Sequence, residues 1–315
     1  MKYKLISRIS NGLGNQMFIY AASFSIAKKI NKDLFIDPYS GLNNDKKKVL
    51  NNNFKHKHHE PKFRLDIFNL TSKIADDNLC FNTFFKDLKR KILKFFDLFI
   101  KKKNFLLENK KKNKQTFFDE KVYKKKFNNV VYLEGYFESE KYFIDQRSNI
   151  INEFTIKNEI KCNENYLREI INSNSVSLCF RSDRYTEKYE DDKDINKLNK
   201  TKLFEKDQYN FILRAVNYFE QNLSNPKFYL FSDNFTNLEK YFSENKFFFI
   251  KDHINDKVIE DFLLMSKCKH YAVAPTSFHW WAAWLNQSKN KVCLRPKNIN
   301  PSNNSDFWPE SWKAI

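Results

Sequence analysis

Four residues in the C-terminal half of this sequence carry side chains that suit the binding of a phosphorylated ligand. Arg181 follows one apolar run, Asp233 ends a second, and Thr276 and Ser277 follow a third. A guanidinium group can neutralise a phosphate, and a carboxylate can accept hydrogen bonds from a ribose or a base. Hydroxyl groups at a helix start add to the free N–H groups and the positive dipole end that bind anions there.

Two of these residues also have a structural interpretation. Arg181 could form an ion pair with Asp183 or Glu187, and Asp233 could cap a helix that begins at Phe235. A charge that follows an apolar strand is costly unless it has a partner. We favour a ligand as the partner of Arg181 because of its position at the end of the strand. For Asp233 the two roles are compatible, and both stay open.

The N-terminal stretch "ISNGLGNQMF" (9–18) contains a glycine turn between an apolar run and an amphipathic segment. The turn lacks the third glycine of the dinucleotide fingerprint, and it lacks the Gly-Lys-Ser/Thr of a Walker loop. We therefore expect Gly12 and Gly14 to let the backbone approach a ligand. The amides of Asn15 and Gln16 could then reach sugar hydroxyls.

Two groups of residues could in principle hold a metal ion. His56, His58 and His59 lie close together, and Asp192 and Asp194 have the DxD spacing of some sugar-nucleotide enzymes. Both groups lie in polar, lysine-rich stretches, and no cysteine or carboxylate cluster supports the histidines. We interpret both stretches as solvated loops.

Alternating strands and helices are expected to position these side chains. In parallel sheets, ligands bind outside the carboxyl ends of the strands, which would bring Arg181, Asp233 and Thr276 to one edge. The first half opens as strand, helix and strand at 3–9, 15–30 and 33–37. In the second half, strands are predicted at 175–181, 227–233, 246–251, 270–276 and 291–296, with helices at 207–223, 235–242, 257–268 and 277–285.

The composition limits the class of protein and its partners. A chain of 315 residues is long enough for two domains, and its net charge of +18 suits nucleic acid, an anionic membrane or a phosphorylated substrate. Five scattered cysteines without a CxxC pair indicate a reducing cytosol. No apolar stretch approaches the ~20 residues of a membrane-spanning helix, and the first residues do not resemble a signal peptide. We expect a soluble, cytoplasmic protein.

Residues 84–103 are predicted to form an amphipathic helix with aromatic and aliphatic residues on one face and lysines on the other. Such a helix could lie on anionic lipid. It could also pack its apolar face on its own domain and leave the lysines in solvent. We favour the second arrangement.

Six segments spread over nearly the whole chain form a recognisable set. They are "GLGNQMFIYAASFSIAKK" (12–29), "FRLDIFNL" (63–70), "YLEGYFESEKYF" (132–143), "FYLFSDN" (228–234), "FLLMSKCKHYAVAPTSFHWWAAWL" (262–285) and "PESW" (309–312). Together they resemble glycosyltransferase family 11, the bacterial α-1,2-fucosyltransferases. The resemblance implies an α/β fold of the GT-B type, with two Rossmann-like domains facing across a cleft. It also implies an inverting transfer from GDP-L-fucose to a terminal galactoside, without a metal or other cofactor.

The resemblance also assigns roles within the C-terminal half. Arg181 would neutralise the charge that develops on the leaving GDP. Thr276, Ser277 and Phe278 would hold the diphosphate, with Tyr185 and Asp233 as further donor-binding residues. The motif "CFRSDRY" (179–185) departs from the family pattern His-x-Arg-Arg-x-Asp-Tyr: it keeps Arg181 and Tyr185 but has Ser in place of the second Arg. The transferred sugar could therefore be another GDP-linked 6-deoxy sugar or a heptose.

For the N-terminal half, the resemblance assigns the donor contacts across the cleft to Gly14, Asn15 and Gln16. Glu138 stands where the family usually has Gln. Its carboxylate is by its chemical type a candidate base for the acceptor proton, but we favour an acceptor-binding or structural role. His279 replaces the small residue that usually follows the Ser/Thr-Phe motif, and we expect it beside the donor pocket.

The prediction is thus a glycosyltransferase with two domains. Residues 1–155 form an acceptor-side domain with a basic helical insertion at 84–115, and residues 156–315 bind the GDP-sugar. The partners are the donor, a glycan acceptor of a bacterial capsule or lipopolysaccharide, and an anionic membrane contacted peripherally at the inner face of the inner membrane. A nucleic-acid-binding protein is the alternative of another class. The sequence leaves the oligomeric state open.

Overall fold

The computed structural model describes residues 3–43, 62–182, 184–186, 194–236, 238–300, 302 and 304–315. These residues form two compact units. The first contains 3–43, 62–155 and the described part of 302–309, and the second contains 156–300 and 310–315. The prediction placed 156–315 together, whereas the described residues among 302–309 belong to the first unit.

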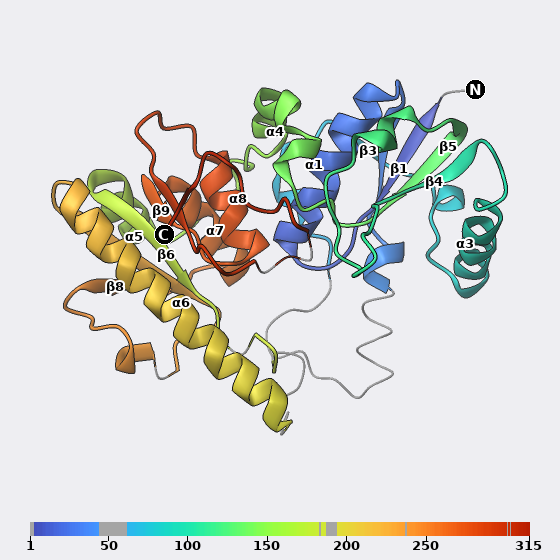
Figure 1. The fold of residues 1–315 in the computed structure, drawn as a ribbon. Coiled ribbons are helices and arrows are strands. Elements are labelled where there is room, and N and C mark those ends of the chain that lie inside the picture. The colour runs from blue at the N-terminus through green and yellow to red at the C-terminus, as the bar shows by residue number, and fades with distance from the viewer. Residues whose placement is uncertain are drawn as a thin grey trace. The chain divides into compact units, whose positions relative to one another are not determined.

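The first unit is built on a five-stranded parallel sheet of order β3-β2-β1-β5-β4. Its first helix is almost entirely buried and contacts β1 and β2 (Figure 1). The burial explains why this helix is apolar on nearly every face. The elements are β1 (Lys4–Arg8), α1 (Leu13–Lys29), β2 (Asp33–Asp37), β3 (Lys73–Ile74), α3 (Phe84–Phe96), β4 (Lys103–Leu107), β5 (Phe127–Glu134) and α4 (Arg147–Glu153).

The predicted helix 84–103 is correct only in its first two thirds. Helix α3 ends at Phe96, and the chain then turns back to add β4 to the sheet. Asp97 makes this turn, since its carboxylate accepts hydrogen bonds from the N–H groups of Asn104 and Phe105 at 2.7 to 2.9 Å. The apolar face of α3 is exposed, so the expectation that it packs on its own domain is wrong.

A charged network fastens α3 to the sheet. Arg90 Nη1 lies 2.9 and 3.0 Å from the two carboxylate oxygens of Glu134 at the end of β5, and Arg90 Nε pairs with Asp87 at 2.8 Å. Lys94 reaches Glu134 at 2.7 Å. Burial alone would raise the pKa of Glu134, but the Lys94 hydrogen bond and the Arg90 charge outweigh it and hold that pKa below its usual value.

Glu134→Gln is expected to lower the free energy of unfolding by about 3 kcal/mol, because it leaves the buried Arg90 guanidinium without its main countercharge. The partly exposed Lys94 makes Lys94→Gln the matched control, with an expected loss of about 1 kcal/mol or less. Urea unfolding monitored by circular dichroism measures both. Equal losses in the two variants would contradict a dominant Arg90–Glu134 pair.

The second unit contains a six-stranded parallel sheet of order β11-β10-β9-β6-β7-β8. The predicted helix 235–242 is wrong: among the residues described there, only the short 3-10 turn Leu238–Lys240 is helical. The elements are α5 (Glu164–Asn172), β6 (Asn174–Phe180), α6 (Ile195–Asn222), β7 (Pro226–Ser232), β8 (Phe247–Phe249), α7 (Lys257–Lys267), β9 (His270–Ala272), α8 (Ser277–Leu285), β10 (Cys293–Arg295) and β11 (Lys313–Ala314).

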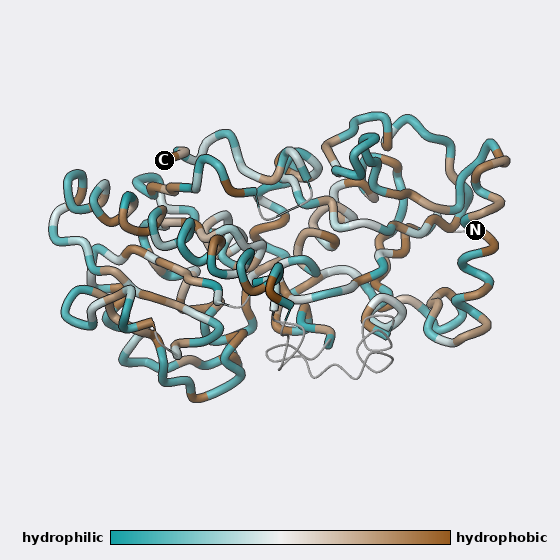
Figure 2. The backbone as a smooth tube through the Cα atoms, turned by 60° about the horizontal axis from the view of Figure 1, so that its bottom comes forward, coloured by the Kyte–Doolittle hydropathy of each residue, from teal (hydrophilic) through white to brown (hydrophobic). Residues whose placement is uncertain are grey.

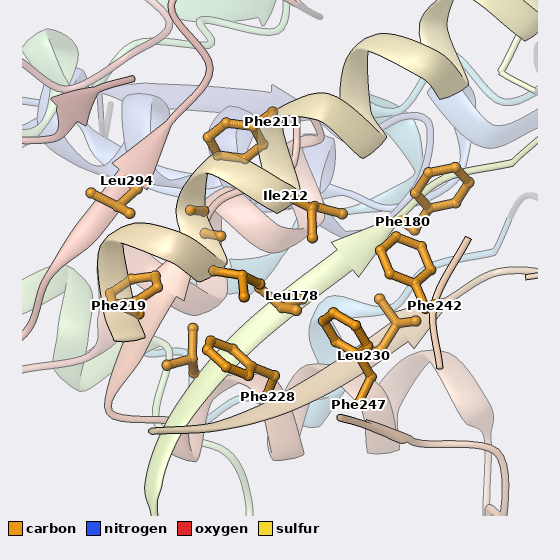
Figure 3. Packing of buried hydrophobic residues seen from close by; sticks show 14 of the residues in the cluster. Leu178, Phe180, Phe211, Ile212, Phe219, Phe228, Leu230, Phe242, Phe247 and Leu294 are labelled. Atoms are coloured by element: carbon orange, nitrogen blue, oxygen red, sulfur yellow. The ribbon is translucent and has the colours of Figure 1, made fainter. Parts of the chain in front are cut away.

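Helix α6 covers one face of this sheet. Phe211, Ile212 and Phe219 of α6 belong to one buried cluster with Leu178 and Phe180 of β6 (Figure 3). Successive strand residues point to opposite faces, so the alternate residues of β6 are buried on the side away from α6. Both faces of β6 are therefore buried, but the side away from α6 carries Ser175, Ser177 and Cys179. Hydrophobic and hydrophilic stretches alternate along the chain (Figure 2).

Among the described residues, no helix is both long and apolar enough to cross a bilayer. All five cysteines are buried and carry free thiols.

Candidate active site

The three strand ends singled out in the sequence lie side by side. Strand β6 is flanked by β7 and β9, with Phe180 opposite Ser232 and Leu178 opposite Ala272. Arg181 and Asp233 therefore leave neighbouring strands at the same level. The expected convergence of these strand ends at the carboxyl edge is confirmed.

Arg181 is held by a residue that the sequence analysis did not single out. The buried Gln208 of α6 accepts a hydrogen bond from the Arg181 N–H at 3.1 Å and donates one to the Arg181 carbonyl at 2.9 Å. The side chain of Arg181 is half-buried. Gln208 thus fixes the backbone from which the guanidinium projects.

Asp233 joins the ends of β6 and β7. Its carboxylate accepts hydrogen bonds from the N–H groups of Ser182 and Asn234, both at 3.1 Å. The role of a cap for a helix from Phe235 is wrong, since the described residues form no helix there. Asp233 instead orders the loop that carries the altered "CFRSDRY" motif.

Helix α8 begins where the sequence predicts it. Thr276 is its N-cap, and the Thr276 hydroxyl accepts a hydrogen bond from the His279 N–H at 3.2 Å. Ser277 in the first turn is partly exposed. Phe278 packs its ring against Phe262 of α7, with ring centroids 5.4 Å apart.

His279, which we expected beside the donor pocket, is fully buried beneath the start of α8. Its Nδ1 accepts a hydrogen bond from the Ala274 N–H at 3.0 Å, so Nε2 carries the hydrogen and donates to Ser177 Oγ of β6 at 2.9 Å. Burial lowers the pKa of His279 to about 3. The neutral imidazole therefore ties the loop before α8 to the central strand.

Two further charges near this edge, those of Asp261 and Lys257, were not predicted from the sequence. Burial, followed by the carboxylates of Asp233 and Asp261, raises the pKa of the Cys179 thiol far above its usual value, while Arg181 and Lys257 oppose the shift. Two carboxylates and two cations therefore lie close enough to the end of β6 to affect the pKa of Cys179. A phosphate or nucleoside bound here would meet charges of both signs.

Asp261 pairs with His253 in the loop after β8. His253 Nε2 lies 2.7 Å from Asp261 Oδ1, and this contact raises the pKa of His253. The signal was present in the sequence, since "DH" directly follows the predicted strand 246–251. The strand-end rule applied to that strand points to His253 but not to Asp261, which lies on α7.

Tyr185 is exposed, and its ring meets Phe204 of α6 edge-on at 6.0 Å. Its N–H donates to Thr201 Oγ1 at 3.3 Å, which fixes the end of the motif on α6. Asp183 and Glu187, the alternative ion-pair partners of Arg181, lie outside the described residues.

In the first unit, Gln16 of α1 is fully buried, and its amide serves the backbone. Nε2 donates to the carbonyls of Asn11 at 2.7 Å and Lys62 at 2.8 Å, and Oε1 accepts from the Arg64 N–H at 3.0 Å. Both amide hydrogens are used, so Gln16 holds the glycine turn in place and offers no N–H to a sugar.

The glycine turn itself presents open backbone at the start of α1. Gly12 is the N-cap, and a Cβ added there would meet nothing within 4 Å. Gly14 is buried in the first helical turn, and Asn15 beside it is half-buried. Among the predicted donor-binding residues Gly14, Asn15 and Gln16, only Asn15 has a partly exposed side chain.

Glu138 follows β5 in a turn whose backbone is tightly specified. Gly135 has φ +149°, and a Cβ there would lie 2.6 Å from Glu108 Cβ. Phe137 is buried in the left-handed region at φ 53°. Ser302 Oγ donates a hydrogen bond to the Glu138 carboxylate.

The possible metal ligands are only partly within the described chain. His56, His58, His59 and Asp192 lie outside it. Asp194 caps α6, accepting from the Asn196 N–H at 2.9 Å. Among the described residues, no group of three or more His, Cys, Asp or Glu side chains could hold a metal ion.

Two α/β units in one chain, each built on a parallel sheet, have the architecture of the GT-B fold. The fucosyltransferase NodZ from Bradyrhizobium shares this fold with a TM-score of 0.51, at 13% identity over 96% of this chain and 97% of that one. Residues 9–314 match glycosyl transferase family 11, and the chain belongs to this family.

Two relatives from Escherichia coli align over almost the full length. An alpha-1,2-colitosyltransferase is 27% identical over 327 residues, which cover 99% of this chain and 98% of the relative. The O-antigen biosynthesis glycosyltransferase WbnK is 26% identical over 335 residues, covering 98% and 99%.

Proposed function

We propose that this glycosyltransferase transfers L-fucose from GDP-L-fucose to a terminal galactoside of a bacterial surface glycan, forming an α-1,2 linkage without a metal ion. The observation that carries the proposal is the convergence of Arg181 and the N-terminus of α8 at one sheet edge. Both features favour a diphosphate, one by its charge and the other by its free N–H groups.

The reaction follows from these groups. The acceptor hydroxyl oxygen attacks the anomeric carbon while the bond from that carbon to the β-phosphate oxygen breaks. Arg181 and the N–H groups at Ser277 and Phe278 stabilise the charge that moves onto the diphosphate, and they do so best in a site from which water is excluded. The Glu138 carboxylate takes the hydroxyl proton. Asp233 and Tyr185 bind the nucleoside side of the donor, and Gly14 and Asn15 bind its sugar side.

A second candidate donor is a GDP-linked sugar other than fucose, such as colitose or a heptose. It is favoured by the alpha-1,2-colitosyltransferase among the relatives. The "CFRSDRY" motif also supports it, because Ser182 and Arg184 change the polar groups beside Arg181.

A donor panel tests the proposal. GDP release is measured with GDP-L-fucose, GDP-colitose, GDP-heptose and UDP-galactose, each with a galactoside acceptor and with or without EDTA. We expect turnover with GDP-L-fucose that EDTA leaves unchanged. Turnover with GDP-colitose or GDP-heptose alone would select the second candidate, and turnover that requires a UDP-sugar or a metal would overturn both.

Because the chain is a glycosyltransferase, its positive charge needs an explanation other than nucleic acid. We propose a cytoplasmic enzyme that contacts the anionic inner face of the bacterial inner membrane, where a lipid-linked acceptor would be presented. The five free, buried thiols suit a reducing compartment.

A further inference from the structure

Helix α3 is attached to its sheet in the reverse of the usual orientation. A surface helix normally turns its apolar face to the core. Here the inward face carries Arg90, which is buried and paired with Glu134 and Asp87, and Lys94, which also reaches Glu134. In Figure 1, α3 lies beside the edge strand β4, with β5 next to it.

The outward face is apolar and exposed. The α3 surface consists of eight large side chains, of which Leu88 is 46% exposed and Phe85 80%. Several of their rings contact one another, and none of the eight is buried. The members are Phe84, Phe85, Leu88, Ile92, Phe95, Phe96, Leu98 and Phe99.

Lysines border this surface. At about 100° per residue, Lys89 and Lys91 fall on the two sides of the apolar face, and both are exposed. Lys101 and Lys102 follow its C-terminal end and are also exposed. Long basic side chains that flank aromatic residues can reach lipid headgroups while the rings enter the boundary with the acyl chains.

The lysines that border the α3 surface favour an anionic lipid over a second copy of the chain as its partner. Two copies that meet through this surface would bring their lysine borders together, which is unfavourable. An anionic lipid surface attracts each lysine near it by about 1 kcal/mol. A bilayer also accepts a convex row of aromatic side chains without a complementary groove.

We propose that the α3 surface docks the enzyme on an anionic membrane, with the helix lying in the interface and its apolar face inserted. Because the Arg90–Glu134 pair and the Asp97 turn fix α3 to the sheet, insertion would also orient the first unit on the bilayer. The inference rests on the proposed location of the enzyme but not on its donor or acceptor.

Vesicle flotation of the full-length enzyme tests the proposal. The probes are vesicles of phosphatidylcholine alone and vesicles that also contain phosphatidylglycerol. The variant is Phe85→Ser/Phe99→Ser, which alters two exposed rings and leaves the charged network intact. Ile171→Ser, an exposed apolar position on α5, is the matched control. Lys101→Gln/Lys102→Gln isolates the electrostatic part.

We expect wild type and Ile171→Ser to float with the anionic vesicles, and Phe85→Ser/Phe99→Ser to lose at least about tenfold in partition coefficient. The Lys101→Gln/Lys102→Gln variant should bind more weakly, with a smaller dependence on salt. Failure of wild type to float overturns the proposal. So does equal binding of the Phe85→Ser/Phe99→Ser variant, or a wild-type dimer in gel filtration that this variant abolishes.

Transfer to a soluble galactoside separates this inference from the proposed function. The Phe85→Ser/Phe99→Ser and Ile171→Ser variants should keep wild-type transfer to that acceptor, because neither changes a residue assigned to donor or acceptor binding. Flotation without any transfer in wild type would overturn the proposed function and leave membrane docking standing.

Discussion

Arg181→Ala is expected to lower kcat by about a thousandfold while leaving the melting temperature unchanged. The guanidinium neutralises the charge that passes to the diphosphate as the bond to the sugar breaks, and no solvent rearrangement is then needed. The backbone hydrogen bonds to Gln208 do not involve the side chain, so the fold around β6 should persist. Steady-state GDP release and thermal unfolding measure the two effects.

Arg181→Lys and Arg168→Ala are the matched variants. Lysine keeps the charge but loses the planar fork, so we expect it to restore only a small part of kcat. Arg168 is an exposed arginine on α5, and its loss should change neither activity nor stability. Activity of Arg181→Ala within a few fold of wild type would refute the role assigned to Arg181.

Acidification is expected to destabilise the second unit through His279. The pKa of His279 is about 3 in the folded protein and ~6.5 in an unfolded chain. Below ~6.5 the unfolded state takes up a proton that the folded state excludes, so stability falls with pH until the folded pKa is reached. Between about pH 7.5 and pH 4.5 the loss should be roughly 3 kcal/mol.

Two substitutions each preserve one of the two side-chain hydrogen bonds of His279 and remove its titration. His279→Gln can preserve the hydrogen bond to Ser177, and His279→Asn can preserve the one from Ala274, while neither side chain titrates. Both should be less stable than wild type at neutral pH and should lose less stability in acid. Urea unfolding at pH 7.5 and pH 4.5 gives the acid-induced loss of stability for each protein. Carboxylates such as Glu134 contribute equally to wild type and variants, so their contribution cancels when the losses are compared. A wild-type slope equal to that of both variants would contradict the prediction.

Local patterns were enough to locate the main features of the candidate site. Apolar runs bounded by Arg181, Asp233 and Thr276 predicted strand ends, and the parallel-sheet rule placed them at one edge. This succeeded because a parallel sheet buried on both faces has a continuous apolar signal, and its ligand edge follows from chain direction alone. The resemblance to family 11 then supplied the class of reaction.

The tertiary structure alone decided what holds these residues in place and which way α3 faces. The partners of Gln16, Gln208 and His279 are backbone or hydroxyl groups that lie apart in sequence, and such groups leave no periodic signal. An amphipathic pattern likewise states that a helix has two faces, but not which one meets the sheet. For α3 the choice depends on Glu134, 44 residues from Arg90, whose buried charge draws the basic face inward and leaves the aromatic face outside.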